Sequence, residues 1–282
     1  MREVIKERAS ALFSVTTLGR GEVCVGGQPI TDKAFKTQKV KLLLVLLVLS
    51  HGKDLNEDDL IEALWPDTGL AGRRSLNTAL CLLRKAVGPQ AAWAIERERG
   101  FLRIRRDATV WCDTPVFEAL MRQAVALRDR HEVAGAARLL QQASALYQGR
   151  YLDGCYLEWA VRKRETLELM ATTALTELAT HALETGNLEA ALEHATRATE
   201  IDPYDEGAHQ LVMRAHTRLG RPDRAIRQFE RCQRRFRDDL AQDLSIALVE
   251  ECLRARIGTA ATAPIVSAAP RWQRRTSLPQ SA

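Results

Sequence analysis

The sequence lacks an apolar run long enough to cross a membrane. Its longest uninterrupted apolar segment, Leu42 to Leu49, has eight residues, whereas a membrane-spanning helix needs about 18 to 20. The N-terminus also lacks the charged, apolar and small-residue order of a secretory signal. The six cysteines are scattered without a C-x-x-C pair, a pattern typical of free thiols in a reducing compartment. We therefore expect a cytoplasmic protein with no membrane partner.

Motifs for catalysis, cofactors and metals are missing as well. The sequence has no G-x-x-x-x-G-K-[ST] phosphate loop, no nucleophile elbow and no carboxylate pair with a matching base. Its six histidines show neither His-x-x-x-His nor Cys/His spacing, so each is better explained as a helix-surface residue than as a metal ligand. These absences predict a protein that is not an enzyme and that binds no cofactor or metal.

The chain does have the length for two ordinary domains, with 282 residues of which 46% are apolar and 27% charged. In the first half, short apolar segments from Phe13 to Ile30 alternate with glycine turns and predict strands. Three helices are expected next, at about 37–50, at 57–65 behind the N-cap residue Asn56, and at 71–87. Two strands around Arg99-Gly100, at 94–98 and 100–105, complete the order of a winged helix.

Positive charge is concentrated in residues 71–106, which carry nine basic and two acidic residues, a net charge of +7 against +5 for the whole chain. In the helix at 71–87, Leu76, Leu80, Leu83 and Val87 form one apolar stripe, so the polar residues must lie on the opposite face. The resulting hypothesis has three parts. Base edges are contacted by Arg74, Asn77, Thr78 and Cys81, phosphates by Arg73, Arg84 and Lys85, and the wing is formed by Arg97, Arg99 and Arg103.

Simpler explanations exist for each feature alone. Arginines such as Arg73 and Arg74 on an amphipathic helix more often mark a solvated face, and the alternating charges at 96–99 would also suit an edge strand protected against aggregation. Their joint occurrence in winged-helix order favours double-stranded DNA as the partner. The alternative is a helical-repeat adaptor whose basic N-terminal domain docks a protein.

The second half predicts an α-helical domain with a 34-residue repeat. Gly186 and Gly220 are separated by this period, as are Ala191 and Ala225, and the spacing is that of tetratricopeptide (TPR) repeats. Two copies are too few for an independent solenoid, so flanking helices must cap them. Equal numbers of basic and acidic residues from 113 to 282 favour protein contacts or self-association. For the arginine-rich run at 224–237, a solvated helix face is favoured over a second DNA patch.

Several motifs resemble one family. Residues 39–44, 59–66, 73–80 and 83–88 resemble the DNA-binding domain of SARP-type antibiotic-regulatory transcriptional activators, which is similar to the winged helix of OmpR-type response regulators. Residues 147–152, 219–225 and 229–232 resemble the bacterial transcriptional activator domain that follows it in that family. Where family members often have serine and arginine, this chain has Cys81 and Leu82.

The resemblance implies a mainly α fold with a small β part, in which a winged helix precedes a TPR-like domain. The expected divisions are a flexible arm at 1–12, the OmpR-type winged helix at 13–110, the bacterial transcriptional activator domain at 114–257 and a disordered tail at 258–282. The expected function is that of a sequence-specific DNA-binding regulator, an activator by resemblance. RNA polymerase, and a second copy of the chain bound through the helical domain, are further candidate partners.

Overall fold

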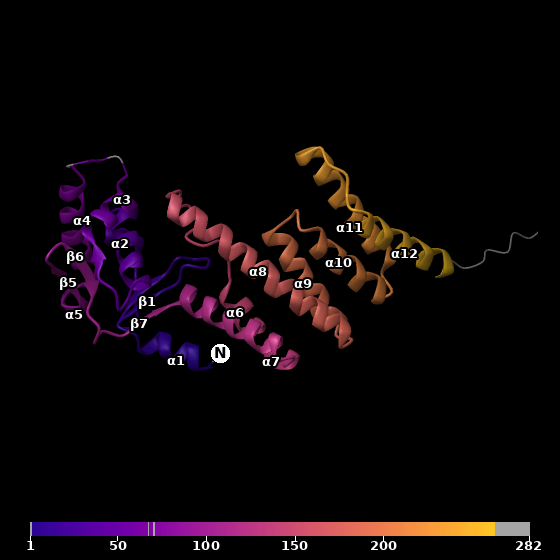
Figure 1. The fold of residues 1–282 in the computed structure, drawn as a ribbon, viewed down its shortest axis with the longest axis horizontal. Helices are drawn as coiled ribbons and strands as arrows, with labels where there is room; N and C mark the ends of the chain where they lie inside the picture. Colours follow the sequence, from indigo (N-terminus) through magenta and orange to yellow (C-terminus); the bar gives the residue numbers. More distant parts are fainter. Residues whose placement is uncertain (1, 67, 70, 263–282) are drawn as a thin grey trace, which may run out of the picture.

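The structure, a computed structural model, describes residues 2–66, 68–69 and 71–262. The molecule is elongated, with all of its strands in the N-terminal part and with helices α11 and α12 at the opposite end (Figure 1). Most of the described residues are helical, and a winged helix precedes a TPR-like helical domain. The predicted fold class is therefore confirmed.

The N-terminal part contains the predicted strands, helices and hairpin in the expected order. Its elements are β1 (Phe13–Val15), β2 (Val23–Val25), β3 (Gln28–Ile30), a 3-10 turn (Asp32–Phe35), α2 (Gln38–Leu49), β4 (Leu55–Asn56), α3 (Glu57–Leu64), α4 (Ala71–Val87), α5 (Pro89–Ala92), β5 (Ile95–Glu98) and β6 (Phe101–Ile104). Helix α2 is apolar on nearly all sides because it lies at the centre of this domain.

The N-cap residue of α3 and the turn between β5 and β6 form the local structures that the sequence predicts. The side chain of Asn56 accepts a hydrogen bond from the backbone N–H of Asp58 at 2.8 Å and begins α3. Strands β5 and β6 pair in antiparallel register through a two-residue turn in which Arg99 and Gly100 both have positive φ, at 49° and 84°. A two-residue hairpin turn of this kind matches the twist of the strands that it joins, so the hairpin is firmly defined beside α4.

The C-terminal part is a row of helices packed mostly against their sequence neighbours. It comprises α6 (Asp113–Asp129), α7 (Val133–Leu146), α8 (Glu158–Glu184), α9 (Leu188–Ile201), α10 (Glu206–Arg218), α11 (Pro222–Arg235), a π-helical turn (Phe236–Leu240) and α12 (Ile246–Thr262). The two repeat glycines, Gly186 and Gly220, follow α8 and α10 with positive φ, and the two repeat alanines, Ala191 and Ala225, are fully buried where the following helices pack back.

The two termini differ from the prediction. Helix α1 (Arg2–Ser10) occupies the segment predicted to be a flexible arm. Its last turn is held because Arg8 pairs with Glu22 at 3.1 Å and lies over the ring of Trp111, contacts between distant segments that sequence periodicity does not reveal. At the other end, α12 starts at Ile246 and continues to Thr262, beyond the expected start of the tail at 258. Residues 263–282, the rest of the predicted tail, lie outside the described residues.

A strand that joins the two halves lies between the expected winged helix and the helical domain. Strand β7 (Val110–Cys112) pairs in parallel with β1 and completes a sheet of order β3-β2-β1-β7. Directly after it, the buried carboxylate of Asp113 accepts hydrogen bonds from the backbone N–H groups of Thr17 and Leu18 at 2.8 to 2.9 Å. Burial raises the pKa of Asp113, although these hydrogen bonds oppose the shift.

The loop between α7 and α8 packs against the same place. Tyr151 forms a bridge with Leu18, and Gly19, at φ 124°, lies so close to Gln148 that a Cβ atom at Gly19 would be 3.3 Å from the Gln148 Cβ. The buried guanidinium of Arg164 holds this loop by donating to the carbonyls of Tyr151, Leu152 and Cys155.

These contacts merge the two halves into one hydrophobic core that extends from Phe13 to Leu178. Trp159 on α8 also donates its indole N–H to the carbonyl of Ala63 in α3 at 3.1 Å. The winged helix is therefore fixed on the helical domain by a strand, a buried carboxylate and shared apolar packing. The domain division at 110–114 stays a prediction, because this core runs across it.

Candidate nucleic-acid interface

The polar face of α4 points to solvent at the outer end of the molecule. Leu76, Leu80 and Leu83 are buried against α2 and α3, which forces the opposite side of the helix outwards (Figure 1). All seven α4 residues that the sequence singled out are exposed: Arg73, Arg74, Asn77, Thr78, Cys81, Arg84 and Lys85. The structure thus brings these candidates together on one helix face.

The basic residues of this face differ in how free they are. Among the described residues, none forms an ion pair or a side-chain hydrogen bond with the side chain of Arg74 or of Lys85. Arg73 pairs with Asp58 at 3.1 Å, but both side chains are about two thirds exposed, so this pair adds little stability and can exchange readily. Arg84 donates to the backbone carbonyl of Ile95 at 2.9 Å and thereby links α4 to the hairpin.

The hairpin carries far less free charge than its sequence suggests. Arg103 contacts three carboxylates, those of Glu96, Asp54 and Glu98, at 2.9 to 3.3 Å. The hydrogen bonds to Glu96 and Asp54 raise the pKa of Arg103 further above its ordinary value. Intramolecular carboxylates thus neutralise most of the positive charge of this arginine.

Two further arginines of the hairpin region differ widely in how strongly they are ion-paired. Arg105 pairs with Asp107 at 2.9 Å and with Glu96 at 3.1 Å. Arg99, at the turn, has a side chain that is 90% exposed. Its ion pair with Glu98 is long, with 3.9 Å between Nε and the carboxylate oxygen. Of the three wing residues predicted from the sequence, only Arg99 projects with a largely free guanidinium.

Arg97 connects the hairpin to α4 in a way that the sequence did not indicate. Its guanidinium donates two hydrogen bonds to the carboxylate of Glu57, at 2.6 and 2.7 Å, and a third to the side-chain oxygen of Asn77 at 2.7 Å. The hydrogen bonds from Arg97 hold the pKa of Glu57 below its ordinary value although burial opposes the shift. This hydrogen bond fixes the orientation of the Asn77 amide, whose N–H₂ group forms no hydrogen bond with another described residue.

A hollow of about 750 Å³ lies between α4, α5 and the hairpin. Its lining comprises Asn77, Leu80, Cys81, Arg84, Lys85, Gly88, Pro89, Ala92 and Arg97. The free thiol of Cys81 is exposed at its edge. The carboxylates that shape this surface, Asp54, Glu57 and Asp58, were missed as site residues. In the sequence Glu57 and Asp58 indicate only the acidic first turn of α3, and Asp54 precedes its N-cap residue.

The structure thus combines a winged helix, whose basic helix α4 lies at the outer end, with a TPR-like helical part that shares its core. A family model described as the bacterial transcriptional activator domain matches residues 112–254. The chain belongs to this family, and the resemblance to SARP-type regulators seen in the motifs is confirmed.

Two relatives extend the comparison beyond the helical domain. The chain is 27% identical over 240 residues to the regulatory protein AfsR of Streptomyces coelicolor, an alignment that covers 84% of this chain and 23% of AfsR. Its fold is similar to that of Mycobacterium tuberculosis EmbR, solved in complex with a low affinity phosphopeptide, with a TM-score of 0.66, 22% identity and coverage of 87% of this chain and 65% of that chain. The chain thus spans less than a quarter of AfsR and 65% of the EmbR chain.

The family to which the chain belongs is described as a transcriptional activator domain. Within residues 2–66, 68–69 and 71–262, no helix has the length and apolar character that crossing a membrane requires. In the same residues, no group of three or more potential ligand side chains is placed to hold a metal ion.

Proposed function

We propose that this protein activates transcription by binding specific DNA sites, with α4 in the major groove and the β5–β6 hairpin against the phosphate backbone. The observation that carries the proposal is the exposed face of α4, where Arg74 and Lys85 are free of intramolecular ion pairs beside Asn77, Thr78 and Cys81. The major groove of B-DNA admits a single α-helix, and arginine and asparagine side chains recognise guanine and adenine edges there.

Asn77 has the most specific geometry for this task. Asparagine recognises adenine by donating to N7 and accepting from N6, or by donating alone when its oxygen is engaged elsewhere. Here Arg97 holds that oxygen at 2.7 Å, so the amide N–H₂ group is a fixed donor. We infer that Asn77 discriminates bases by donation, and that Arg97 positions Asn77 instead of contacting phosphate as its position in the wing suggested.

The sequence hypothesis is otherwise retained as part of the proposal. Arg74, Thr78 and Cys81 contact base edges, Arg73, Arg84 and Lys85 contact phosphates, and Arg99 is the principal phosphate contact of the hairpin. Arg103 serves mainly to hold the hairpin together, because three carboxylates surround it. Phosphate contacts set position and orientation on the duplex, while base contacts set the choice of site.

Selection of bound genomic fragments by the full chain, followed by sequencing and a salt titration, tests the proposal. We expect a common sequence among the retained fragments and a binding constant that falls steeply with salt. Asn77→Ala should relax the preference at one base position, at a cost of about tenfold in discrimination. Arg138→Ala, which removes an exposed arginine from α7, should leave both preference and affinity unchanged.

The rival function, a helical-repeat adaptor whose basic domain docks a protein, makes the opposite prediction. An adaptor of that kind would retain no selected fragments, and Asn77→Ala would change nothing in the titration. Retention of all fragments alike, without a common sequence, would also contradict the proposal of specific sites.

A further inference from the structure

A groove in the helical domain lies far from α4, at the end of the molecule where α11 and α12 are found (Figure 1). Its volume is about 730 Å³, and α9, α10 and α11 form its walls. The lining contains apolar, hydroxyl and basic side chains: Leu192, Thr196, Thr199, Glu200, Pro203, His209, Val212, His216, Gln228, Arg231, Cys232, Arg234 and Arg235.

The groove is positively charged. Arg231, Arg234 and Arg235 line it against one carboxylate, that of Glu200, and no described acidic side chain forms an ion pair with any of the three. Burial lowers the pKa of both lining histidines, His209 and His216, so they add no charge at neutral pH. The net charge of the lining comes from the arginines of α11.

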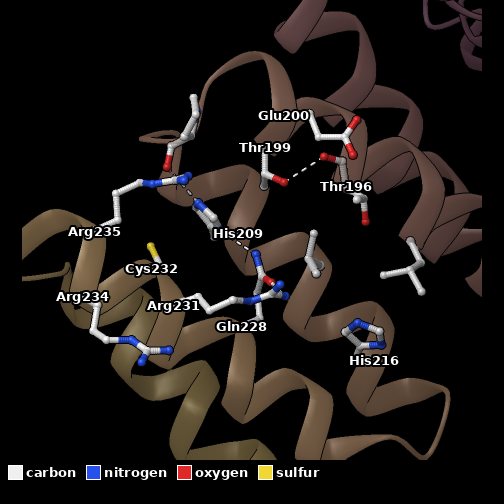
Figure 2. Close-up of a pocket in the computed structure, with 13 residues that line it drawn as sticks. Thr196, Thr199, Glu200, His209, His216, Gln228, Arg231, Cys232, Arg234 and Arg235 are labelled. Carbon is white, nitrogen blue, oxygen red and sulfur yellow. Dashed lines mark hydrogen bonds between the residues drawn. The ribbon is translucent and has the colours of Figure 1, made fainter.

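One of these arginines is held in place by a buried chain of hydrogen bonds, shown in Figure 2. His209 contacts the carbonyl of Pro203 through Nε2 at 3.0 Å, and its Nδ1 accepts from the side-chain amide of Gln228 at 2.7 Å. The Gln228 oxygen in turn accepts from Arg231. Because the chain fixes the His209 tautomer and the Gln228 orientation, the guanidinium of Arg231 is preorganised beside the groove.

A second, independent feature points to a missing ligand. His216 is 9% exposed and lines the groove, and its Nδ1 atom is buried without a hydrogen-bond partner. A buried polar atom left unpaired is costly, and most such atoms in folded proteins find a partner. In this conformation Nδ1 is inaccessible, so a ligand can pair with it only if the imidazole ring turns toward the groove. A peptide backbone, which carries both donors and acceptors, can then satisfy this nitrogen in either tautomer, which a bare anion cannot.

The dimensions of the groove suit a short extended segment. Its lining residues span 192–200 on α9 and 228–235 on α11, which at 1.5 Å per residue is roughly 10 to 12 Å. An extended chain advances about 3.3 Å per residue, so about four residues fit along it. We propose that this groove binds an acidic, extended segment of a partner protein, with carboxylates on Arg231, Arg234 and Arg235 and backbone groups on His216.

Other occupants fit less well. The rim arginines could touch phosphates, but a DNA duplex is too wide to enter a groove of this size and reach the buried His216. The chain's own segment at 263–282 contains Arg271, Arg274 and Arg275 and no acidic residue, so its charge has the same sign as that of the groove. An acidic partner segment is the occupant that satisfies both the arginines and the histidine.

Fluorescence anisotropy with the full chain and three blocked, dye-labelled ten-residue peptides tests the proposal. The probes alternate alanine with glutamate, glutamine or lysine, so they differ mainly in charge. We expect the glutamate peptide to bind at least about tenfold more tightly than the glutamine peptide and the lysine peptide not at all. Arg231→Gln, Arg235→Gln and His216→Phe should each weaken the glutamate peptide by about threefold to tenfold.

Arg227→Gln is the matched control, because Arg227 is exposed on the same helix but does not line the groove. It should change the affinity by less than about twofold. An equal loss in Arg227→Gln would show general attraction to a basic surface and overturn the proposal, as would equal affinity for the glutamate and glutamine peptides.

Two further measurements distinguish other occupants. If Arg231→Gln or Arg235→Gln weakens binding to selected DNA as much as Arg99→Ala does, the groove contacts nucleic acid and the proposal fails. If either variant changes the mass measured by light scattering, the groove is a contact between copies of the chain, and the proposal fails equally. The proposal of peptide binding in this groove is independent of the DNA-binding proposal, since either one can fail while the other holds.

Discussion

Helix α4 and the β5–β6 hairpin both carry several basic residues, yet these residues have opposite surroundings in the structure. On α4, Arg74 and Lys85 point to solvent without a described carboxylate partner. On the hairpin, Arg97, Arg103 and Arg105 are all engaged by acidic side chains at 2.6 to 3.3 Å. The comparison shows that a charge counted along a sequence is not the charge that a partner meets.

The two regions therefore have different proposed tasks. The α4 face presents free donors that can form hydrogen bonds with a base edge or a phosphate. Most arginines of the hairpin instead form ion pairs that stabilise the hairpin itself. Only Arg99 at the turn extends from the hairpin into solvent. In the proposed interface, the hairpin accordingly contributes one main phosphate contact and a scaffold, and α4 contributes the other contacts.

The largest expected effect separates α4 from the rest of the basic surface. Arg74→Ala should lower the affinity for selected DNA sites by about tenfold to a hundredfold, because it removes an unpaired guanidinium from the base-reading face. The measurement is a titration of a selected site by anisotropy at fixed salt, with thermal unfolding as a check of folding.

Arg138→Ala is the control, since it removes the same charge from the helical domain. If Arg74→Ala and Arg138→Ala weaken DNA binding equally, the affinity comes from the overall charge of the protein, and the proposal that α4 contacts the bases is wrong.

A smaller effect distinguishes the free arginine of the hairpin from a paired one. Arg99→Ala should weaken all DNA sites alike and lower the slope of log K against log salt by about one, because it removes one phosphate contact. The midpoint of thermal unfolding of the Arg99→Ala variant should equal that of the wild type, since the side chain of Arg99 is 90% exposed. Arg103→Lys keeps the charge but cannot bridge Glu96, Asp54 and Glu98, so it should lower the thermal midpoint and leave the salt slope as it is.

An unchanged slope in Arg99→Ala would remove the hairpin from the DNA interface. A loss of affinity for DNA in Arg103→Lys without a lower thermal midpoint would show that paired arginines also contact phosphate, and the contrast between the two regions would then fail.

Sequence periodicity was sufficient to place the main helices. The predicted helix at 71–87 coincides with α4, because Leu76, Leu80, Leu83 and Val87 repeat at the spacing of one helix face and are all buried. It could not place β7, whose parallel partner β1 lies almost a hundred residues earlier, nor α1, which is held by Glu22 and Trp111. Long-range pairing leaves no local pattern in a single sequence.

For the candidate site, the sequence predicted the exposure of side chains but not their ion-pair partners. Alternation of apolar and polar residues predicted which α4 side chains would be exposed, and they are. It did not predict that Arg97 would lie against Glu57, forty residues away, or that Arg103 would gather three carboxylates. Ion pairs between elements depend on tertiary packing, so charge patterns in sequence give exposure more reliably than they give partners.

The smallest expected change tests the link between the two regions. Arg97→Lys keeps the charge but cannot bind both Glu57 oxygens and Asn77 at once, so the Asn77 amide should lose its fixed orientation. In the wild type the hydrogen bonds from Arg97 lower the pKa of Glu57, and a lysine at position 97 still offers this carboxylate one positive charge. Affinity for random DNA should therefore change by less than about twofold, while discrimination at the Asn77-dependent base should fall by about threefold to fivefold.

A double-mutant cycle gives this prediction its sharpest form. If Arg97 acts through Asn77, then Asn77→Ala and Asn77→Ala/Arg97→Lys should discriminate equally, because the positioning residue has nothing left to position. Additive losses would mean that Arg97 contacts DNA by itself, as its place in the hairpin first suggested. Additive effects together with a loss of affinity for random DNA in Arg97→Lys would make Arg97 a phosphate contact, and the hairpin would then contribute two phosphate contacts instead of one.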